Sequence, residues 1–177
     1  MKKEINMDNL RASIRSIPDW PKKGVIFRDI TPILKEAKLF RFIINKLAER
    51  CKGKKIDKVV GIDARGFLLA SALAYKLNVG LAIIRKKGKL PYKTIKKDYS
   101  LEYATETLEI HIDAVEKKER VLMIDDVLAT GGTMKAAVNL VEELGAKVVL
   151  ILFLIELKDL KGREKLEGHL VESLIKF

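Results

Sequence analysis

Two adjacent carboxylates stand directly before a glycine-rich loop in the segment VLMIDDVLATGGT, residues 121–133. Asp125 and Asp126 follow four apolar residues. An ionised carboxylate only accepts hydrogen bonds, so this pair suits hydroxyl groups. Gly131 and Gly132 let the backbone turn so that several N–H groups can point at one anion. A sugar that carries a phosphate would satisfy both halves of the segment.

The anion-binding half of this segment has the composition of a phosphate cradle. Residues 129–133 lead into a stretch that predicts a helix over Thr133–Leu144, ended by Gly145. The helix N-terminus adds partial positive charge, and Thr130 and Thr133 add hydroxyl donors. No G-x-x-x-x-G-K-[ST] occurs, so this is not a Walker loop. An acidic strand end with an ordinary glycine turn is the alternative, and the full strand–loop–helix pattern favours the cradle.

Apolar runs alternate with helical periodicity along most of the chain. Helical spacing also predicts helices over Lys35–Cys51 and Ala64–Leu77. Continuous or alternating apolar residues predict strands over residues 57–61, 79–86, 106–112, 121–124 and 146–155. This alternation indicates an α/β fold with a mostly parallel twisted sheet and helices on both faces. Ligands of such sheets bind beyond the carboxyl ends of the strands, where a strand ending at Asp125 would place both carboxylates.

Three other segments have weaker patterns. Asp8–Ser16 could form a short helix capped by Asp8. Ile17–Leu34 contains three prolines and is expected to be an irregular arm. The basic segment Lys86–Ala104 has no clean period, and a long irregular loop in a compact domain is usually functional or disordered.

The overall charge points to an anionic partner. The 177 residues carry a formal net charge of +11, and 48% are hydrophobic, which fits one packed domain. A basic protein suits nucleic acid, an acidic membrane or a phosphorylated small molecule, although solubility alone could also explain the charge. Few aromatic residues and no RNA-stacking motif argue against nucleic acid.

The cysteine content and hydropathy indicate a reducing, aqueous compartment. Cys51 is the only cysteine, so no intrachain disulfide can form, and a packing role is expected for it. The N-terminal residues lack the apolar core of a signal peptide, and the apolar run from Val148 is too short to span a bilayer. We therefore expect a cytoplasmic protein without a membrane partner.

The segment VLMIDDVLATGGT resembles the 5-phosphoribosyl-1-diphosphate (PRPP) signature of the type I phosphoribosyltransferases. Three more segments are similar, in order and spacing, to the adenine-specific branch of that family: IPDWPKKGVIFRDITPIL, GIDARGFLLASALAYKL and YSLEYATETLEIH. The resemblance runs from about Ile17 to Ile155. It implies the type I phosphoribosyltransferase fold in one domain, 1–177, with a base-binding arm at 1–34 and a flexible lid at 86–104.

The resemblance also implies a reaction and its components. Adenine N9 would be joined to C1 of PRPP, giving AMP and pyrophosphate, with Mg²⁺ held mainly by PRPP and water. A homodimer is implied as well, in which basic residues of the lid could reach the active site of the neighbouring subunit. By motif match, PRPP would contact Asp125, Asp126, Ala129, Thr130, Gly131, Gly132 and Thr133. Pyrophosphate would contact Asp63, Ala64, Arg65, Arg85, Lys86 and Lys89, and adenine would contact Val25, Phe27, Arg28 and Leu128.

Two residues match the catalytic positions of the family. Glu102 would face adenine N7, because attack by N9 makes the imidazole ring acidic there and a carboxylate can accept that proton. Arg65 follows the family's pyrophosphate loop, in which a non-proline cis peptide is expected at Asp63–Ala64. Ala104 stands where the family usually has glycine, which would stiffen the lid. Glu106, on the following strand, is expected to contribute little.

Plainer roles remain open for single residues. Ordinary core packing is the alternative for Phe27 and Leu128, and a solvated surface position is the alternative for Glu102 and for each lysine. Two other functions also remain open. One is a transferase for another purine or for orotate, and the other is a regulator that senses PRPP without chemistry. The arm and the presence of Glu102 favour the adenine enzyme.

Overall fold

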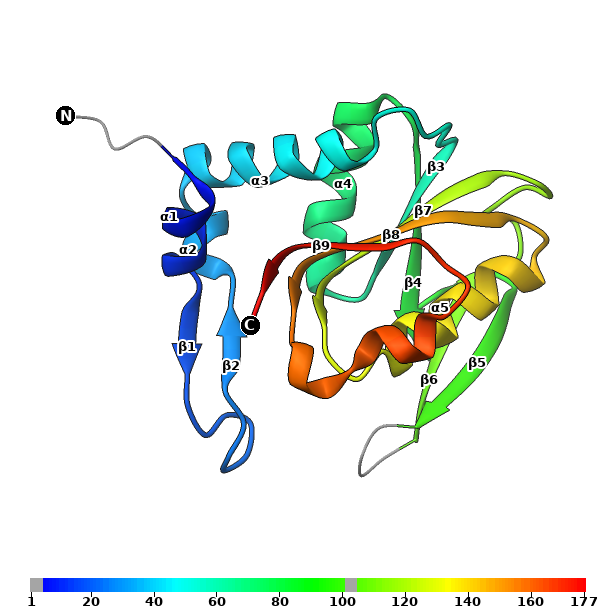
Figure 1. Cartoon of the computed structure of the whole chain (residues 1–177). Coiled ribbons are helices and arrows are strands. Elements are labelled where there is room, and N and C mark those ends of the chain that lie inside the picture. Colours follow the sequence, from blue (N-terminus) through cyan, green and yellow to red (C-terminus); the bar gives the residue numbers. More distant parts are fainter. Residues whose placement is uncertain (1–4, 101–104) are drawn as a thin grey trace. The chain divides into compact units, whose positions relative to one another are not determined.

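The computed structural model describes residues 5–100 and 105–177, so the predicted catalytic Glu102 and neighbouring Ala104 lie outside the described residues. The chain divides into two compact units, Met1–Lys46 and Leu47–Phe177. Figure 1 shows the elements of both units along the chain. No helix of the described residues is long and apolar enough to cross a membrane.

The N-terminal unit contains short elements where the sequence predicts a helix and an irregular arm. In chain order they are α1 (Met7–Ala12), β1 (Arg15–Ile17), β2 (Phe27–Asp29), α2 (Thr31–Leu34) and the first turns of α3 (Ala37–Arg50). Strands β1 and β2 pair antiparallel, with Arg15 opposite Asp29.

Both predictions for this unit need correction. Helix α1 begins before Asp8 because Asn6 is the N-cap, and its side chain accepts the Asn9 N–H at 2.9 Å. The arm is regular from Phe27 onward, where β2 pairs with β1. The Asp29 carboxylate then accepts hydrogen bonds from the N–H and hydroxyl of Thr31, at 2.9 and 2.8 Å, at the start of α2.

The C-terminal unit is a seven-stranded sheet with the order β5-β6-β4-β3-β7-β8-β9. Its strands are β3 (Lys58–Ile62), β4 (Gly80–Lys86), β5 (Thr94–Ser100), β6 (Thr105–His111), β7 (Arg120–Leu128), β8 (Lys147–Glu156) and β9 (Val171–Lys176). Its helices are α4 (Arg65–Leu77), α5 (Gly132–Glu143) and the 3₁₀ turns η1 (Lys158–Leu160) and η2 (Gly162–Leu166). Four strand pairs are parallel and two are antiparallel, which confirms the predicted mostly parallel sheet.

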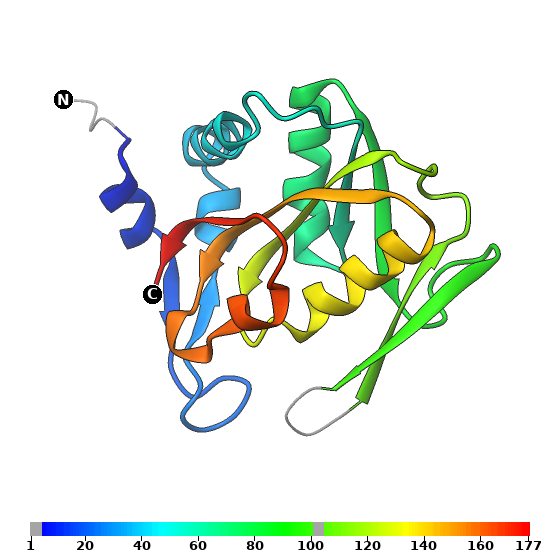
Figure 2. The ribbon, with the colours of Figure 1, turned by 45° about the vertical axis from the view of Figure 1, so that its right-hand side comes forward.

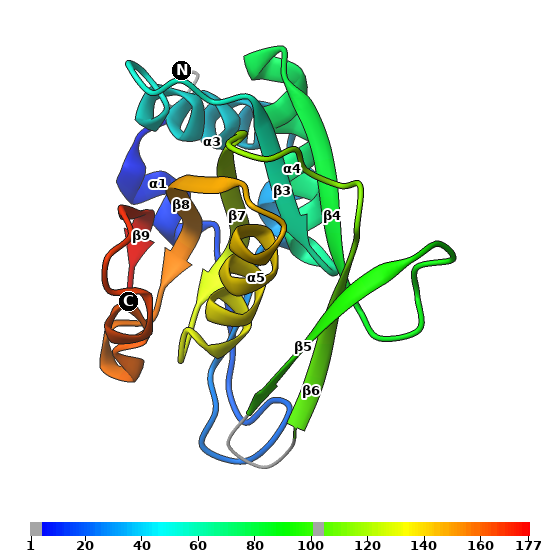
Figure 3. The same cartoon turned by 90° about the vertical axis from the view of Figure 1, so that its right-hand side faces the viewer.

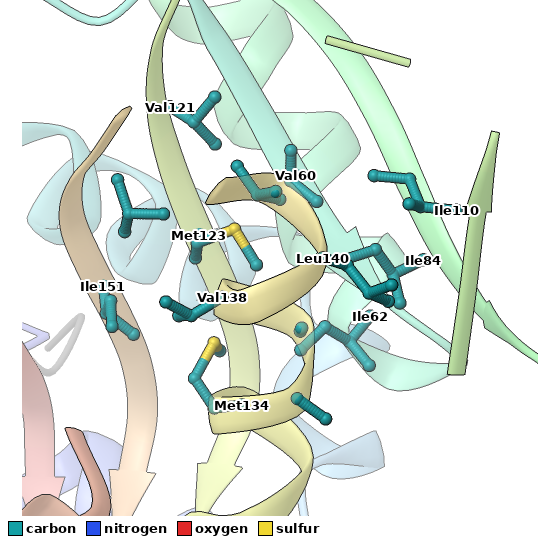
Figure 4. Close-up of a cluster of buried hydrophobic side chains, with 14 of the residues drawn as sticks. Val60, Ile62, Ile84, Ile110, Val121, Met123, Met134, Val138, Leu140 and Ile151 are labelled. Carbon is teal, nitrogen blue, oxygen red and sulfur yellow. The ribbon is translucent and has the colours of Figure 1, made fainter. Parts of the chain in front are cut away.

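The alternation of side chains along β3 directs two helices to opposite faces of this sheet. Val60 and Ile62 are fully buried in the cluster that also contains Val138 and Leu140 of α5 (Figure 4). Successive side chains in a strand point to opposite faces, so Gly61 between them faces the other way, towards Gly66 and Ala70 of α4. Figure 2 shows α4 and α5 with the central strands between them.

The contact at Gly61 is too close for a larger residue, so we expect Gly61→Ala to destabilise the protein. An added Cβ would lie 2.6 Å from the Ala70 Cβ and 3.3 Å from the Gly66 carbonyl oxygen. Overpacking of this kind costs about 1–3 kcal/mol in the free energy of unfolding. Urea denaturation would measure it. The double variant Gly61→Ala/Ala70→Gly should be less destabilised than the sum of the two single variants. Strict additivity would show that the two positions do not interact.

The second half of the predicted lid is regular structure. Strand β5 pairs antiparallel with β6 over seven residue pairs, from Thr94–His111 to Ser100–Thr105. This hairpin joins the sheet through only two pairs between β6 and β4, Arg85–Glu109 and Lys86–Leu108. Figure 3 shows β5 and β6 beyond the end of β4. Residues 94–100 of the segment without a clean period are therefore a strand, because their register is set by β6 rather than by their own hydrophobicity.

Cys51 is packed, as the sequence predicts. Its side chain is 5% exposed, and its Sγ lies 3.4 Å from the Leu47 carbonyl oxygen. Burial raises the pKa of the thiol to about 11.

Candidate active site

A cavity of about 520 Å³ lies in the C-terminal unit beyond the carboxyl end of β3 and beside the later residues of β7. These strands are parallel neighbours, with Gly61 opposite Ile124, so the residues that follow both strand segments meet at one edge. The cavity is lined by Asp63, Ala64, Arg65, Lys86, Lys89, Tyr99, Glu106, Asp125, Asp126 and Thr133.

The carboxylate pair is held by Arg65 from the start of α4. Arg65 Nε lies 2.7 Å from Asp126 Oδ2, and the Asp126 side chain is only 7% exposed. Oδ2 is buried, and apart from this ion pair it accepts no hydrogen bond from the described residues. Asp125 Oδ1 accepts the backbone N–H of Asp126 at 2.8 Å. Both acceptors are thus fixed by short local contacts.

Burial raises the pKa of both carboxyls. For Asp125 the pKa is well above its usual range, because of burial first and the neighbouring charge of Asp126 second. For Asp126 burial also raises the pKa, while the Arg65 guanidinium acts in the opposite direction. Holding negative charge here is therefore costly without a partner, as is common where a protein prepares a binding site.

The predicted phosphate loop follows β7, but the strand does not end at Asp125. It continues to Leu128 because β8 pairs with it as far as Leu128–Glu156, whereas β3 stops opposite Ile124. Gly131 has φ +78°, which favours glycine, and α5 begins at Gly132. Thr133 in the first turn of α5 lines the cavity.

The predicted pyrophosphate residues lie together on β3, α4 and β4. Asp63 Oδ2 is 3.4 Å from both Arg85 Nε and Lys89 Nζ. Arg85 also donates to the Lys89 carbonyl at 3.1 Å. The peptide bond Asp63–Ala64 is cis, which confirms that prediction. Arg85 and Lys89 thus both contact the Asp63 carboxylate, and a bound anion could replace that carboxylate as their partner.

Sequence reasoning missed Tyr99 and placed Glu106 outside the site. Glu106 lines the cavity, where its Oε1 lies 2.9 Å from Lys86 Nζ and its Oε2 accepts the Tyr99 hydroxyl at 2.7 Å. Hydrogen bonds from Lys86 and Tyr99 lower the pKa of Glu106. Burial and the acceptor Glu106 raise the pKa of Tyr99 to about 12, so the phenol stays protonated. Only the pairing of Tyr99 with Glu106 across the hairpin reveals this contact.

The predicted adenine-contact residues belong to different parts of the chain. Val25, Phe27 and Arg28 lie in the N-terminal unit, where the Phe27 ring meets the Trp20 ring edge-on at 4.4 Å between centroids. Arg28 donates to the Ser16 hydroxyl. Leu128 belongs to the C-terminal unit and is 1% exposed in the core cluster, so core packing describes its surroundings.

The fold is that of an α/β protein. Its cavity has carboxylates that can accept hydrogen bonds from hydroxyl groups, and the loop 129–133 beside them can bind an anion. Residues 29–174 match the family described as phosphoribosyl transferase domain. An adenine phosphoribosyltransferase of Geotalea uraniireducens is 56% identical over 171 residues, which cover 97% of this chain and all of the relative. The chain belongs to the type I phosphoribosyltransferase family and, within it, to the adenine phosphoribosyltransferases.

Solved structures of adenine phosphoribosyltransferases share the fold. The protein from Thermoanaerobacter pseudethanolicus superposes with a TM-score of 0.96 at 51% identity, covering 97% of this chain and 100% of that one. The protein from Saccharomyces cerevisiae superposes with a TM-score of 0.90 at 37% identity, covering 95% of this chain and 97% of that one. That structure is a complex with adenine and D-2,5-dideoxy-2,5-imino-altritol 1,6-bisphosphate.

Proposed function

We propose that this chain transfers the 5-phosphoribosyl group of PRPP to N9 of adenine, giving AMP and pyrophosphate in purine salvage. The observation that carries the proposal is the carboxylate pair Asp125–Asp126 at the cavity, followed by the loop 129–133 at the start of α5. The relative from Saccharomyces cerevisiae was solved with adenine bound, which supports adenine as the base.

PRPP would be held by the residues after β7. Its 5-phosphate would accept hydrogen bonds from the N–H groups and hydroxyls of residues 129–133, where the helix start adds partial positive charge. Its ribose hydroxyls would donate to Asp125 and Asp126, and the place of both carboxylates in the cavity lining supports this assignment.

The pyrophosphate group would displace carboxylates from the basic side chains. Lys86 is now paired with Glu106, and Lys89 and Arg85 with Asp63. A phosphate accepts charge-assisted hydrogen bonds from cations as a carboxylate does, so an exchange of partners is expected on binding. Arg65, next to Ala64, would reach the same group.

Mg²⁺ fits this site as a companion of the substrate. The cavity lining has four carboxylates, Asp63, Glu106, Asp125 and Asp126, and a divalent cation would offset part of the repulsion between them and a polyphosphate. The ion would be held mainly by PRPP and water.

The reaction needs one bond formed, one bond broken and one proton removed. The electron pair of adenine N9 forms the bond to C1, and the C1–O bond breaks with its electron pair leaving on pyrophosphate. Glu102 would accept the proton that becomes acidic at N7. Val25 and Phe27 would contact the base, and Arg28 would do so mostly through its backbone. The hairpin segment would serve as a lid that excludes water.

A base-competition assay tests the proposal. Radiolabelled adenine, hypoxanthine, guanine and orotate would be incubated separately with PRPP, Mg²⁺ and the protein. We expect labelled nucleotide from adenine only. A faster reaction with another base would contradict the proposed specificity, and PRPP binding without any product would favour a sensing regulator.

We expect Glu106→Gln to tighten PRPP binding by about two- to fivefold. The variant keeps the shape of the side chain but removes the charge that competes for Lys86, and an exposed pair of this kind contributes about 0.2–1 kcal/mol. The exposed fractions of the two side chains, 50% for Lys86 and 31% for Glu106, justify this small value. Titration calorimetry with PRPP would measure it. Weaker binding would mean that Glu106 itself helps to hold the ligand.

We also propose that the protein, one domain over 1–177 with an arm at 1–34 and a lid at 86–104, is a cytoplasmic homodimer. The single cysteine suits a reducing compartment. Sedimentation should give a dimer at working concentrations. If lid residues act across the interface, mixing Lys89→Ala and Asp125→Asn chains should restore part of the activity. A monomer that is fully active would contradict the shared site.

A further inference from the structure

A backbone contact outside the recognised motifs supports the phosphate loop. Gly162 is the first residue of η2 and lies directly against the loop. A Cβ on Gly162 would overlap the Ala129 carbonyl oxygen and come within 3.0 Å of the Gly131 nitrogen. Conversely, a Cβ on Gly131 would overlap the Gly162 carbonyl oxygen. Any movement of Gly162 therefore moves the loop or opens a gap beneath it.

An ion pair fixes the position of Gly162. The next residue, Arg163, donates through Nε and Nη2 to the two carboxylate oxygens of Glu156, at 2.6 and 2.8 Å. Its Nη1 also donates to the Val171 carbonyl oxygen at 2.7 Å, and Ser173 Oγ donates to Glu156 Oε2 at 2.5 Å. A planar guanidinium that donates two hydrogen bonds to one carboxylate is held in one orientation, whereas a lysine ammonium can rotate. The ion pair therefore fixes the orientation of η2 as well as its position.

The same ion pair is anchored at the base of the loop. Glu156 ends β8 and lies opposite Leu128, the last residue of β7 before the loop, and the Leu157 N–H donates to the Leu128 carbonyl at 2.9 Å. The Glu156 side chain is 7% exposed. Its hydrogen bonds from Arg163 lower its pKa to about 2, so the pair stays charged at neutral pH.

We propose that Gly162, Arg163 and Glu156 are positioning residues for PRPP. They hold the loop 129–133 in the conformation in which its N–H groups receive the 5-phosphate. This inference rests on the proposed function. Hydrogen-bond donors must be placed to within about 0.5 Å to bind well, so a small shift of the loop weakens PRPP binding and leaves the chemistry at adenine intact.

The variants Gly162→Ala and Arg163→Met test this role. Gly162 does not have a positive φ, so alanine acts through its overlap with the loop and through a close contact with the Leu128 side chain, 2.8 Å from the added Cβ. Arg163→Met removes the ion pair but keeps the aliphatic stem. We expect at least about tenfold weaker PRPP binding in both, the loss of roughly one good hydrogen bond to a charged group. The KM for PRPP should rise, and kcat at saturating PRPP should stay within about twofold. Arg163→Lys should recover part of the affinity.

Hydrogen exchange of the loop amides in the ligand-free protein supplies a second measurement. Exchange at residues 130–133 should be faster in Gly162→Ala and Arg163→Met than in the parent. The control is Gly168→Ala, which has φ +87° and no atom within 4 Å of the added Cβ, so it loses stability without touching the loop.

The outcomes separate this inference from the proposed function. If Gly162→Ala and Arg163→Met lower Tm like Gly168→Ala but keep the parent's loop exchange and PRPP affinity, the positioning role is refuted. If Gly162→Ala does not fold, the Arg163 variants decide. A parent protein that binds no PRPP would refute the proposed function, whereas the exchange rates would still test whether η2 holds the loop.

Discussion

Replacing Glu102 with glutamine is expected to lower kcat with adenine by about 10²–10⁴-fold, the usual contribution of a positioned general base. The dissociation constant for PRPP should stay nearly unchanged, because the sugar phosphate is assigned to the residues after β7. Glu102→Leu should be worse, since leucine cannot form a hydrogen bond. Single-turnover rates would measure the chemical step without product release.

The control for Glu102 has to lie away from the cavity. Glu106 is unsuitable because it contacts Lys86 and Tyr99 in the cavity. Glu167 is exposed, so Glu167→Gln is a better match for the same chemical change. Turnover by Glu102→Gln at the parent rate would show that Glu102 is only a lid residue and that the proton leaves to water.

Asp125→Asn is expected to weaken PRPP binding by about five- to tenfold while making the free protein more stable. The affinity falls because a hydroxyl donates more strongly to a carboxylate than to an amide, and hydrogen bonds to charged groups contribute about 1–1.5 kcal/mol more than neutral ones. The stability rises because asparagine keeps the shape of the side chain and removes a charge that is costly beside Asp126. Calorimetry and urea denaturation would measure the two effects separately.

The stability effect of Asp125→Asn should depend on pH in a defined direction. The pKa of Asp125 is raised in the folded protein, so the folded state binds this proton more tightly than the unfolded chain does. Its contribution to stability is therefore present below the unfolded pKa of about 3.9 and is lost as pH rises through the folded pKa. Asparagine does not ionise, so Asp125→Asn does not lose this stability as pH rises. The difference in stability between the variant and the parent should therefore be larger near about pH 7 than near about pH 4.

An exposed carboxylate provides the comparison for this pH dependence. Asp159 is exposed on η1, and Asp159→Asn should show little difference between the two pH values. Equal stability of parent and Asp125→Asn at both pH values would contradict the assigned cost of the buried charge.

Elements with strong local patterns could be predicted from the sequence. Strand β8 is apolar along most of its length because it is covered on both faces, and α5 has a helical period that ends before Gly145. The cavity residues Asp125 and Asp126 could be named because they follow an apolar run and precede a glycine-rich loop. Asp63 and Arg65 could be named from the resemblance to a family motif, and the parallel pairing of β3 with β7 brings the two segments together.

Elements that depend on distant partners could not be predicted. Strand β2 is three residues long and exists because β1 pairs with it, and β5 takes its register from β6. Strand β9 likewise pairs with β8 at the edge of the sheet. The roles of Glu106 and Gly162 could not be predicted for the same reason. Gly162 belongs to no recognised motif, Glu106 lies in a recognised segment but was expected to contribute little there, and each reaches the cavity or the loop through a tertiary contact.

The buried Cys51 makes this protein suitable for site-specific labelling. With a pKa of about 11, only about one thiol in 10⁴ is ionised at pH 7, and the thiolate is the form that reacts with maleimides. A cysteine introduced at Lys96, half-exposed on β5, would therefore react selectively without removal of the native one. A fluorophore there would report movements of the hairpin as substrates bind, in a chain that otherwise keeps its natural sequence.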